Sequence, residues 1–337
     1  MEIQTNFSLK NYNTFGIEAK AKQFVAVHSI AELKTVLEEN KSQKKFILGG
    51  GSNMLLTQDI DALVIHVDLK GKKIIKDDDN FVWVESQAGE NWHEFVLWTI
   101  DQNFGGLENM SLIPGNVGTT PVQNIGAYGT EIKDTFVSCD AMAIENQKTK
   151  TFSKDECHFG YRESVFKNEV KDQYIITSVV FKLTKRNHKI NISYGDIAAQ
   201  LSNKNIQIPT LKDVSDAVIA IRTSKLPDPK ELGNSGSFFK NPILLKSDFE
   251  KIHQQFPEMK YYDISPTEVK VPAGWLIEQA GFKGKRFGDA GVHKNQALVL
   301  VNYGNATGQE ILDVSKTIQE TIFKTFGIHI EAEVNVI

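Results

Sequence analysis

The most informative part of this sequence runs from Ile113 to Gly129 and reads Ile-Pro-Gly-Asn-Val-Gly-Thr-Thr-Pro-Val-Gln-Asn-Ile-Gly-Ala-Tyr-Gly. It contains small, hydroxyl and amide residues and no charged one, whereas a loop that faces solvent would carry Lys and Glu. This composition favours a backbone that lies close against a large, partly apolar ligand with phosphate groups.

A second glycine-rich segment reads Leu48-Gly49-Gly50-Gly51-Ser52-Asn53-Met54-Leu55 and follows a predicted strand. Consecutive glycines allow backbone N–H groups to converge on an anion, so the segment is a candidate phosphate nest. It is not a P-loop, because the Gly-Lys-Ser/Thr end is missing, and Met54 occupies the third glycine position of a Rossmann turn. For this segment alone, a flexible turn between two strands is the alternative. The two segments together fit a dinucleotide, which offers two phosphates and a flat ring system.

The composition excludes several classes of protein. The 337 residues include 38 Lys and Arg and 42 Asp and Glu, so the net charge of −4 argues against a broad nucleic-acid footprint. The two cysteines, Cys139 and Cys157, form no CxxC motif, and the histidines show no HxxxH or HExxH spacing, so we expect neither a disulfide framework nor a metal site. The N-terminus shows no signal-peptide pattern, and no apolar run is long enough to span a membrane. We expect a cytoplasmic protein, and a monomer.

Short apolar runs and helical periodicity alternate in the first half of the chain. We expect helices at 30–39 and 92–102 and a charged turn at 70–80. The expected strands are Phe24–Val27, Phe46–Leu48, Leu63–Val67, Phe81–Glu85, Phe136–Ile144, Tyr174–Leu183 and Ile190–Ser193. This mixture of strands and helices without regular βαβ spacing favours an α+β fold.

In the second half we expect a helix at Pro272–Gln279, with Trp275 in the core, and a strand at Gln296–Asn302. A long helix should begin with a capping box at Thr307–Glu310 and end at Gly327.

The C-terminal tail, Ile328–Val336, alternates apolar and polar residues. We therefore expect a strand that buries Ile328, Ile330, Ala332, Val334 and Val336. Glu331 and Glu333 then share the opposite face, and periodicity alone does not choose between them.

Four ordered motifs point to one family. The sequence carries Gly-Gly-Gly-Ser-Asn at 49–53, the 113–129 stretch, Gly-Tyr-Arg-Glu-Ser-Val-Phe-Lys at 160–167 and Gly-Ser-Phe-Phe-Lys-Asn-Pro at 236–242. In this combination the chain resembles the UDP-N-acetylenolpyruvoylglucosamine reductases (UDP-N-acetylmuramate dehydrogenases) from about Phe15 to its C-terminus. These enzymes are bacterial flavoenzymes of peptidoglycan-precursor synthesis.

The resemblance implies an α+β fold: an FAD-binding domain of the vanillyl-alcohol-oxidase type in two subdomains, followed by an α+β substrate-binding domain. We place the subdomains at 1–70 and 71–203 and the substrate-binding domain at 204–327, with the strand at 328–337 returning to the active site. The resemblance also implies NADPH as reductant. We expect the FAD to be non-covalent, because neither Cys139, Cys157 nor any histidine lies in a recognisable flavin-linking motif. The implied FAD-binding residues are Gly49, Gly50, Gly51, Ser52, Asn53, Met54, Pro114, Gly115, Val117, Gly118, Thr119, Thr120, Gln123, Asn124, Gly126, Ala127 and Tyr128.

The family's reaction passes hydride from NADPH to FAD and then to an enolpyruvyl ether, which becomes a lactyl ether. It needs a cation, a proton donor and a second polar group near the substrate carboxylate. The resemblance assigns these roles to Arg162, Ser237 and Glu333. The family pattern Glu-x-Glu-Val selects Glu333 over Glu331. Without the resemblance, Arg162 would be interpreted as half of a surface ion pair and Glu333 as a solvent-facing residue.

Four more residues match positions that bind the substrate in this family. Tyr194 and Lys225 match contacts to the diphosphate in the type I subgroup, which has the longer substrate-binding loop. Asn241 matches a residue that holds the sugar nucleotide, and Gln296 matches a substrate-contacting amide. A core aromatic is the alternative for Tyr194, and a polar residue at the start of a strand is the alternative for Gln296.

Three other functions are weighed against this one. Another FAD-dependent oxidoreductase of the same fold, such as an alcohol oxidase, would have no evident need for Ser237, Glu333, Tyr194 and Lys225 together. A sugar-nucleotide-binding module without catalysis would bind no flavin. A hydrolase is disfavoured, because the segment 233–237 only approaches GxSxG and no apolar strand precedes it.

Overall fold

The computed structural model describes residues 2–194 and 196–337, which form two compact units. Unit 1 comprises Met1–Phe7, Ala21–Gly50 and Ile60–Arg222. Unit 2 comprises Ser8–Lys20, Gly51–Asp59 and Thr223–Ile337. The chain thus passes between the units several times. The predicted division at 70, 203 and 327 stays a prediction.

The first sheet of unit 1 has the strand order β1(Gln4–Ser8)-β2(Lys20–Val27)-β5(Ile60–Val67)-β3(Lys45–Leu48). β2 and β3 both pair with β5 in parallel, and helix α1 (Ile30–Glu39) connects β2 to β3. The Ser29 side chain accepts a hydrogen bond from the Glu32 N–H and so begins α1 at the predicted residue. The apolar face of α1, with Leu33, Val36 and Leu37, is completely buried in the core of this sheet.

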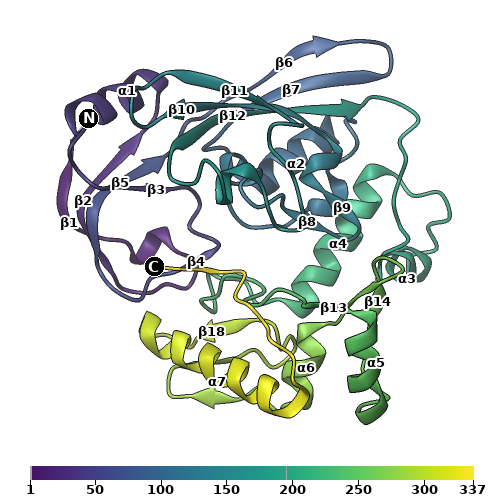
Figure 1. Cartoon of the computed structure of the whole chain (residues 1–337). Helices are drawn as coiled ribbons and strands as arrows, with labels where there is room; N and C mark the ends of the chain where they lie inside the picture. The colour runs from purple at the N-terminus through teal and green to yellow at the C-terminus, as the bar shows by residue number, and fades with distance from the viewer. Residues whose placement is uncertain (1, 195) are drawn as a thin grey trace. The chain divides into compact units, whose positions relative to one another are not determined.

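The second sheet of unit 1 is antiparallel, with the order β11(Thr149–Ser153)-β10(Phe136–Ala143)-β12(Tyr174–Thr184)-β7(Phe81–Gln87)-β6(Lys72–Asp77). Helix α2 (Trp92–Asp101) lies along one face of it (Figure 1). There the Trp92 and Phe95 rings pack on Phe181 at centroid distances of 5.9 and 5.2 Å. The predicted helix and strands are confirmed here.

Two expectations for unit 1 are wrong. The charged segment 70–80 contains the strand β6 rather than only a turn, and five of the six residues of β6 are exposed. An edge strand that faces solvent needs no apolar face. The sequence of β6 therefore lacks the alternation of apolar and polar residues that predicts a half-buried strand. Ile190–Ser193 is not a strand. The Asn191 carboxamide accepts from the Ser193 N–H at 3.1 Å, and such local bonds compete with a ladder.

The last part of unit 1 contains two helices, and the 113–131 region adds the short hairpin β8(Gly126–Ala127)-β9(Thr130–Glu131). Helices α3 (Ile197–Asn203) and α4 (Leu211–Lys225) share a small apolar core. From α4 this core receives Val214, Ala217, Val218 and Ile221, which recur at helical spacing.

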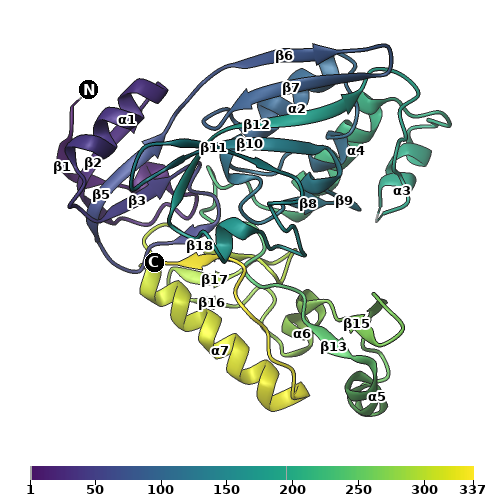
Figure 2. The same cartoon turned by 45° about the horizontal axis from the view of Figure 1, so that its top comes forward.

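Unit 2 contains the sheet β16(Arg286–Phe287)-β17(Ala290–Val292)-β18(Leu300–Asn302), along which helix α7 (Gly308–Phe326) runs (Figure 2). Thr307 and Glu310 form the predicted capping box, and Gly327 ends α7 with φ of 68°, as expected. The predicted strand at 296–302 is shorter than expected, because only Leu300–Asn302 is regular. The other elements are β13(Ile243–Leu245), α5(Lys246–Gln255), β14(Tyr262–Asp263), β15(Glu268–Lys270) and α6(Ala273–Gln279).

The C-terminal tail differs from the predicted strand. Ile328, Ile330 and Val334 are buried as expected, but the chain bends at residues 333–334 and Val336 is 42% exposed. Only β19 (Asn335–Val336) is a regular strand, and it pairs in parallel with β4 (Met54–Leu55). Alternation therefore predicts which residues are buried better than it predicts the backbone conformation.

Candidate active site

In unit 1, Gly49 and Gly50 of the shorter glycine-rich segment lie against the 113–129 stretch. A Cβ on Gly50 would lie 2.8 Å from the Gly115 Cα, and a Cβ on Gly49 would lie 2.5 Å from the Thr119 Cγ2. The 3₁₀ turn Val117–Thr119 is in turn held by bonds from the Val117 N–H to the Glu90 carbonyl and from the Gly118 N–H to the Ala88 carbonyl, both 2.9 Å. Gly49 and Gly50 are therefore required for the close packing of these two segments.

This contact brings three backbone N–H groups together. The Asn116 nitrogen lies 3.1 Å from the Cβ position of Gly50, next to Gly115. In the described parts of the chain, the N–H groups of Gly50, Gly115 and Asn116 donate to no acceptor. Unused N–H groups at one place form an anion-binding nest. They fit a phosphate group of FAD. Asn116 was not among the predicted cofactor residues, because its side chain gives no sign that its backbone contributes.

Asn124 has a structural role inside the same stretch. Its side chain is completely buried and donates to the Gly160 carbonyl at 2.9 Å and to the Glu131 carboxylate at 3.0 Å. Its carboxamide oxygen accepts from the Lys133 N–H at 3.1 Å. The amide is therefore occupied by the protein, and it ties the 113–129 stretch to the loop that follows Gly160.

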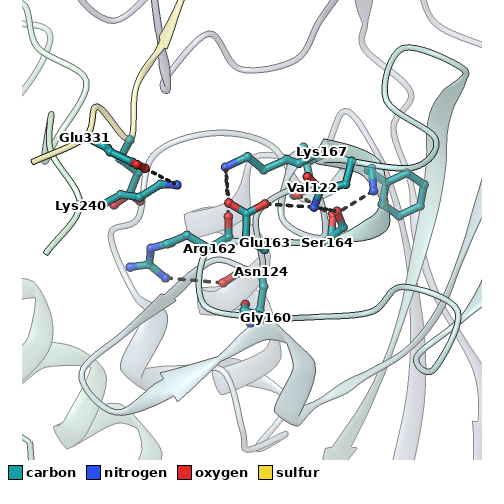
Figure 3. A network of polar contacts seen from close by, with 12 residues as sticks. Val122, Asn124, Gly160, Arg162, Glu163, Ser164, Lys167, Lys240 and Glu331 are labelled. Atoms are coloured by element: carbon teal, nitrogen blue, oxygen red, sulfur yellow. Dashed lines mark hydrogen bonds and ion pairs between the residues drawn. The ribbon is translucent and has the colours of Figure 1, made fainter. Parts of the chain in front are cut away.

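That loop carries Arg162. The guanidinium donates to the Gly126 carbonyl at 2.8 Å and, more weakly, to the Asn124 carbonyl at 3.5 Å (Figure 3). The Lys167 ammonium donates to the Arg162 carbonyl at 3.1 Å and lies 3.6 Å from the Glu163 carboxylate. The structure thus attaches Arg162 to the predicted cofactor stretch within unit 1.

Four residues around this stretch have left-handed backbones, although none is glycine. Their φ values are 59° at Leu112, 43° at Asn124, 49° at Tyr128 and 58° at Arg162. Such conformations cost roughly 1–3 kcal/mol each and persist only where the surroundings impose them, most often at functional sites. Their grouping supports a site here.

Arg222 is a second cation beside this stretch that the sequence analysis missed. It lies on α4 next to the buried Ile221, and its Nε donates to the Leu112 carbonyl at 3.2 Å. The Tyr128 hydroxyl also bonds to it, and desolvation lowers its pKa. The sequence did carry a signal for Arg222: an arginine that lies four residues after the apolar Val218 and directly after Ile221 falls near the apolar face of a helix. Tyr128 also packs edge-to-face on the predicted substrate residue Tyr194, which is 51% exposed.

In unit 2 the segment with Ser237 lies between two others. The Phe238 N–H donates to the Leu298 carbonyl at 2.7 Å, and the Phe238 carbonyl accepts from the Glu333 N–H at 2.8 Å. Phe238 and Phe239 are fully buried, which anchors the segment and leaves Ser237 exposed. Three predicted residues, Ser237, Gln296 and Glu333, therefore lie on neighbouring segments.

The two candidate glutamates differ in their surroundings. The Glu331 side chain is 79% exposed and lies 3.8 Å from the Lys240 ammonium (Figure 3). Glu333 is half-buried at the bend, and the Asn53 carboxamide donates to its carbonyl at 3.2 Å. The bend interrupts the alternation that would have placed both carboxylates on one face. The lower exposure of Glu333 therefore favours it over Glu331 as the catalytic carboxylate, in agreement with the Glu-x-Glu-Val motif.

The other predicted substrate residues make few side-chain contacts with the rest of the protein in the described structure. The Asn241 carboxamide oxygen accepts from the Ala273 N–H at 2.9 Å, at the start of α6. The Gln296 side chain accepts from the Leu298 N–H at 3.4 Å, and Lys225 is exposed at the end of α4. The amide NH₂ groups of Asn241 and Gln296 are the parts of these side chains that could contact a substrate.

Comparison with known proteins defines the class of this chain. Residues 21–151 match a family model described as an FAD binding domain, and residues 228–337 match the C-terminal domain of UDP-N-acetylenolpyruvoylglucosamine reductase. The chain is thus an FAD-dependent oxidoreductase.

It is 84% identical to the UDP-N-acetylenolpyruvoylglucosamine reductase of Flavobacterium johnsoniae over 337 residues, all of both chains, and 47% identical to that of Pseudomonas putida over 99% of each. The chain belongs to the UDP-N-acetylenolpyruvoylglucosamine reductase family.

The crystal structure of the UDP-N-acetylenolpyruvylglucosamine reductase from Thermus caldophilus shares the fold. Its TM-score is 0.68 at 23% identity, over 99% of this chain and 98% of that one. The predicted α+β fold class with an FAD-binding domain is confirmed, and the vanillyl-alcohol-oxidase type of that domain stays a prediction. No helix in residues 2–194 or 196–337 is long and apolar enough to cross a membrane.

Proposed function

We propose that this chain reduces UDP-N-acetylglucosamine enolpyruvate to UDP-N-acetylmuramate, with NADPH as the electron source and FAD as the bound carrier. The full-length likeness to reductases of this name supports the substrate. The observation that carries the proposal is the 2.8 Å bond from the Glu333 N–H to the Phe238 carbonyl, next to Ser237. It places the two predicted acid–base segments side by side in unit 2.

The nest of unit 1 would hold the cofactor. The N–H groups of Gly50, Gly115 and Asn116 would bind its phosphates, and the uncharged 113–129 backbone would lie along it. Bound FAD supplies hydride transfer, the chemistry that amino-acid side chains lack.

Arg162 would stabilise negative charge on the substrate. Reduction of an enolpyruvyl group places charge on the system that carries the carboxylate, and a guanidinium can pair with a carboxylate through two N–H groups. Its bond to the Gly126 carbonyl fixes the guanidinium before substrate binds. A preorganised cation of this kind costs no reorganisation during the reaction.

Ser237 would then donate a proton to the reduced substrate, and Glu333 would polarise the enol or relay the proton. A hydroxyl is a weak acid, so Ser237 needs a polar partner, and exposure leaves its hydroxyl open to substrate or water. Because Glu333 is half-buried, its carboxylate acts in a medium less polar than water, where electrostatic effects are larger.

The remaining assignments concern substrate binding. The Lys225 ammonium and the Tyr194 phenol would bind the diphosphate, while Asn241 and Gln296 would hold the sugar nucleotide through their amides. NADPH and the substrate would use one site in turn.

Anaerobic stopped-flow absorbance of the FAD-loaded protein tests this proposal. We expect NADPH to bleach the flavin, and UDP-N-acetylglucosamine enolpyruvate to restore its colour with formation of UDP-N-acetylmuramate. If NADPH bleached the flavin and the enolpyruvyl compound did not restore its colour, the proposal would be wrong. A protein that bound no FAD would overturn both oxidoreductase functions.

A further inference from the structure

Unit 1 contains a cavity of about 710 Å³, and none of the residues assigned above to FAD or to the substrate lines it. Its walls come from the start of β10, the end of β12 and the loop after α2. Ligand sites in proteins usually have volumes of about 300–1,000 Å³. The cavity is therefore large enough for a small organic ligand, and its lining is separate from the residues of the proposed active site.

The exposed part of the cavity lining is positively charged. Its four cations are Lys154, Lys182, Arg186 and Lys189, and the whole lining contains two carboxylates, those of Glu108 and Asp134. Within residues 2–194 and 196–337, none of the three lysines forms an ion pair. The Lys182 ammonium instead lies 4.1 Å from the centre of the Phe81 ring. This local excess of positive charge, in a chain of net charge −4, favours an anion such as a phosphate group, which carries about −1.5 to −2 charges.

The loop that follows β12 adds unused backbone donors to the same wall. Arg186, Asn187, His188 and Lys189 all line the cavity. Their backbone N–H groups donate to no acceptor within the described part of the chain. Asn187 has a left-handed backbone, with φ of 52°. Successive N–H groups around a left-handed residue form a concave anion-binding surface, so the backbone and the side chains favour the same kind of ligand group.

The buried part of the lining has a different character. The Glu108 side chain is buried, and one of its carboxylate oxygens accepts from the Gly106 N–H at 2.7 Å. The other oxygen has no hydrogen-bond partner among the described residues. His188 bonds to the Thr184 hydroxyl through Nδ1 at 2.7 Å, and its buried Nε2 has no partner among those residues either. Buried polar atoms are nearly always hydrogen-bonded, so these atoms indicate a group that is completed by a ligand or by water. A carboxylate oxygen accepts from an N–H donor and repels an anion.

We propose that this cavity binds a nucleoside monophosphate. The phosphate would lie between the exposed cations and the N–H groups of residues 186–189, and the base would donate its N–H groups to the Glu108 carboxylate. Phe136 and Val137 supply an apolar wall for the base. Guanine matches the carboxylate best, because its N1–H and N2–H donors lie next to each other on one edge. The inference goes beyond the proposed function and does not rest on it, since the two sites share no residue.

The test measures the binding of GMP to the FAD-loaded protein by isothermal titration calorimetry, with excess UDP-N-acetylglucosamine present to occupy the proposed substrate site. Guanosine, inorganic phosphate and 1-methyl-GMP are compared with GMP, because they lack the phosphate, the base and the N1–H donor respectively. Lys182→Gln removes one cation from the cavity. Lys22→Gln is the control, since the Lys22 side chain is 67% exposed, pairs with Asp61 at 2.7 Å and does not line the cavity.

We expect GMP to bind with a Kd below about 1 mM, and each of the three partial ligands to bind at least about tenfold more weakly. Lys182→Gln should weaken GMP binding about fivefold or more, because the phosphate loses a charged partner. Lys22→Gln should stay within about twofold of wild type. Photocrosslinking with 8-azido-GMP, mapped by mass spectrometry, should label peptides that contain residues 134–137 or 182–189.

Absence of GMP binding would overturn the proposal. Equal affinity for GMP and inorganic phosphate would show an unspecific anion site, and binding seen only without UDP-N-acetylglucosamine would assign the nucleotide to the substrate site. Either result would overturn the proposal, as would wild-type affinity in Lys182→Gln or crosslinks only outside the cavity. None of these measurements needs turnover. Failure of the enolpyruvyl reaction would therefore sink the proposed function and leave this test readable.

Discussion

The backbone N–H of Glu333 donates a hydrogen bond of 2.8 Å to the carbonyl oxygen of Phe238, the residue after Ser237. An isolated bridge between Phe239 and Ala332 continues this pairing. The C-terminal end of the chain is thus fixed against the Gly-Ser-Phe-Phe segment by backbone bonds, independently of side-chain identity. Variants of Ser237 and Glu333 should therefore keep the fold, which makes them informative.

Ser237→Ala should separate the two half-reactions. We expect flavin reduction by NADPH to stay within about twofold, whereas reoxidation by the enolpyruvyl substrate should slow about 10²–10⁴-fold, the usual effect of losing a proton donor. Stopped-flow absorbance measures both. Ser235→Ala is the control, because that buried hydroxyl lies 3.1 Å from the Thr14 hydroxyl and should affect stability only. Equal slowing of both half-reactions would refute a proton-donor role.

Glu333→Gln and Glu331→Gln form a matched pair two residues apart. Glu333→Gln should slow reoxidation by substrate at least about tenfold, because its half-buried carboxylate acts on the enol. Glu331→Gln should have less than about a threefold effect, since exposed ion pairs such as that with Lys240 contribute little. Single-turnover rates of both variants measure this, and equal effects would contradict the choice of Glu333.

Gly50→Ala should weaken FAD binding by about tenfold or more, which is ~1.4 kcal/mol. The added Cβ would lie 2.8 Å from the Gly115 Cα, so one of the two backbones that form the nest must move. FAD fluorescence titration measures the change. Gly274→Ala is the control, because its Cβ would meet other atoms no closer than 3.4 Å, within α6. Full FAD affinity in Gly50→Ala would argue against the nest.

His93 should make folding stability depend on pH. Burial and then Arg222 lower its pKa in the folded chain. The contribution of neutral His93 to folding stability is therefore fully present above the unfolded pKa of about 6.5. It is lost as pH falls from there through the lower pKa of the folded state. We expect His93→Asn to flatten the fall of urea-unfolding free energy between about pH 7.5 and 5, and Arg222→Gln to raise the His93 pKa in an NMR titration. An unshifted pKa in that variant would show that Arg222 does not act on His93.

The two cysteines should be unreactive in the folded protein. Cys139 and Cys157 have no exposed surface, and contact with Cys157 together with burial raises the pKa of Cys139. A thiol that is neither accessible nor ionised is a poor nucleophile. A thiol assay should give no reaction under native conditions and two thiols per chain in denaturant. Rapid native modification would show that this part of the core opens.

Much of the architecture could be predicted from local signals. Helix α1 begins and ends at the predicted residues, and α7 begins at its capping box and ends at Gly327, because caps and apolar periodicity are local. The expectations that failed did so for different reasons: a local side-chain bond at Ile190–Ser193, an exposed edge strand at 72–77, and a partner distant in sequence for the C-terminal tail. Strand β6 is mostly exposed and is held by pairing with β7, and the bend at 333–334 arises where the tail leaves Ala332 for β4.

For the candidate site, motifs identified Arg162, Ser237 and Glu333 by residue type, but not what holds them. The bond from Arg162 to the Gly126 carbonyl and the pairing of Glu333 with Phe238 join residues far apart along the chain. Residue order and composition were enough for the family, the cofactor and the regular helices, since these depend on patterns within one segment. Only the tertiary structure brought together the N–H groups of Gly50 and Asn116 and placed Arg222, among the described residues, without a carboxylate at ion-pair distance, because unused hydrogen-bond donors and uncompensated charge exist only after distant segments have packed.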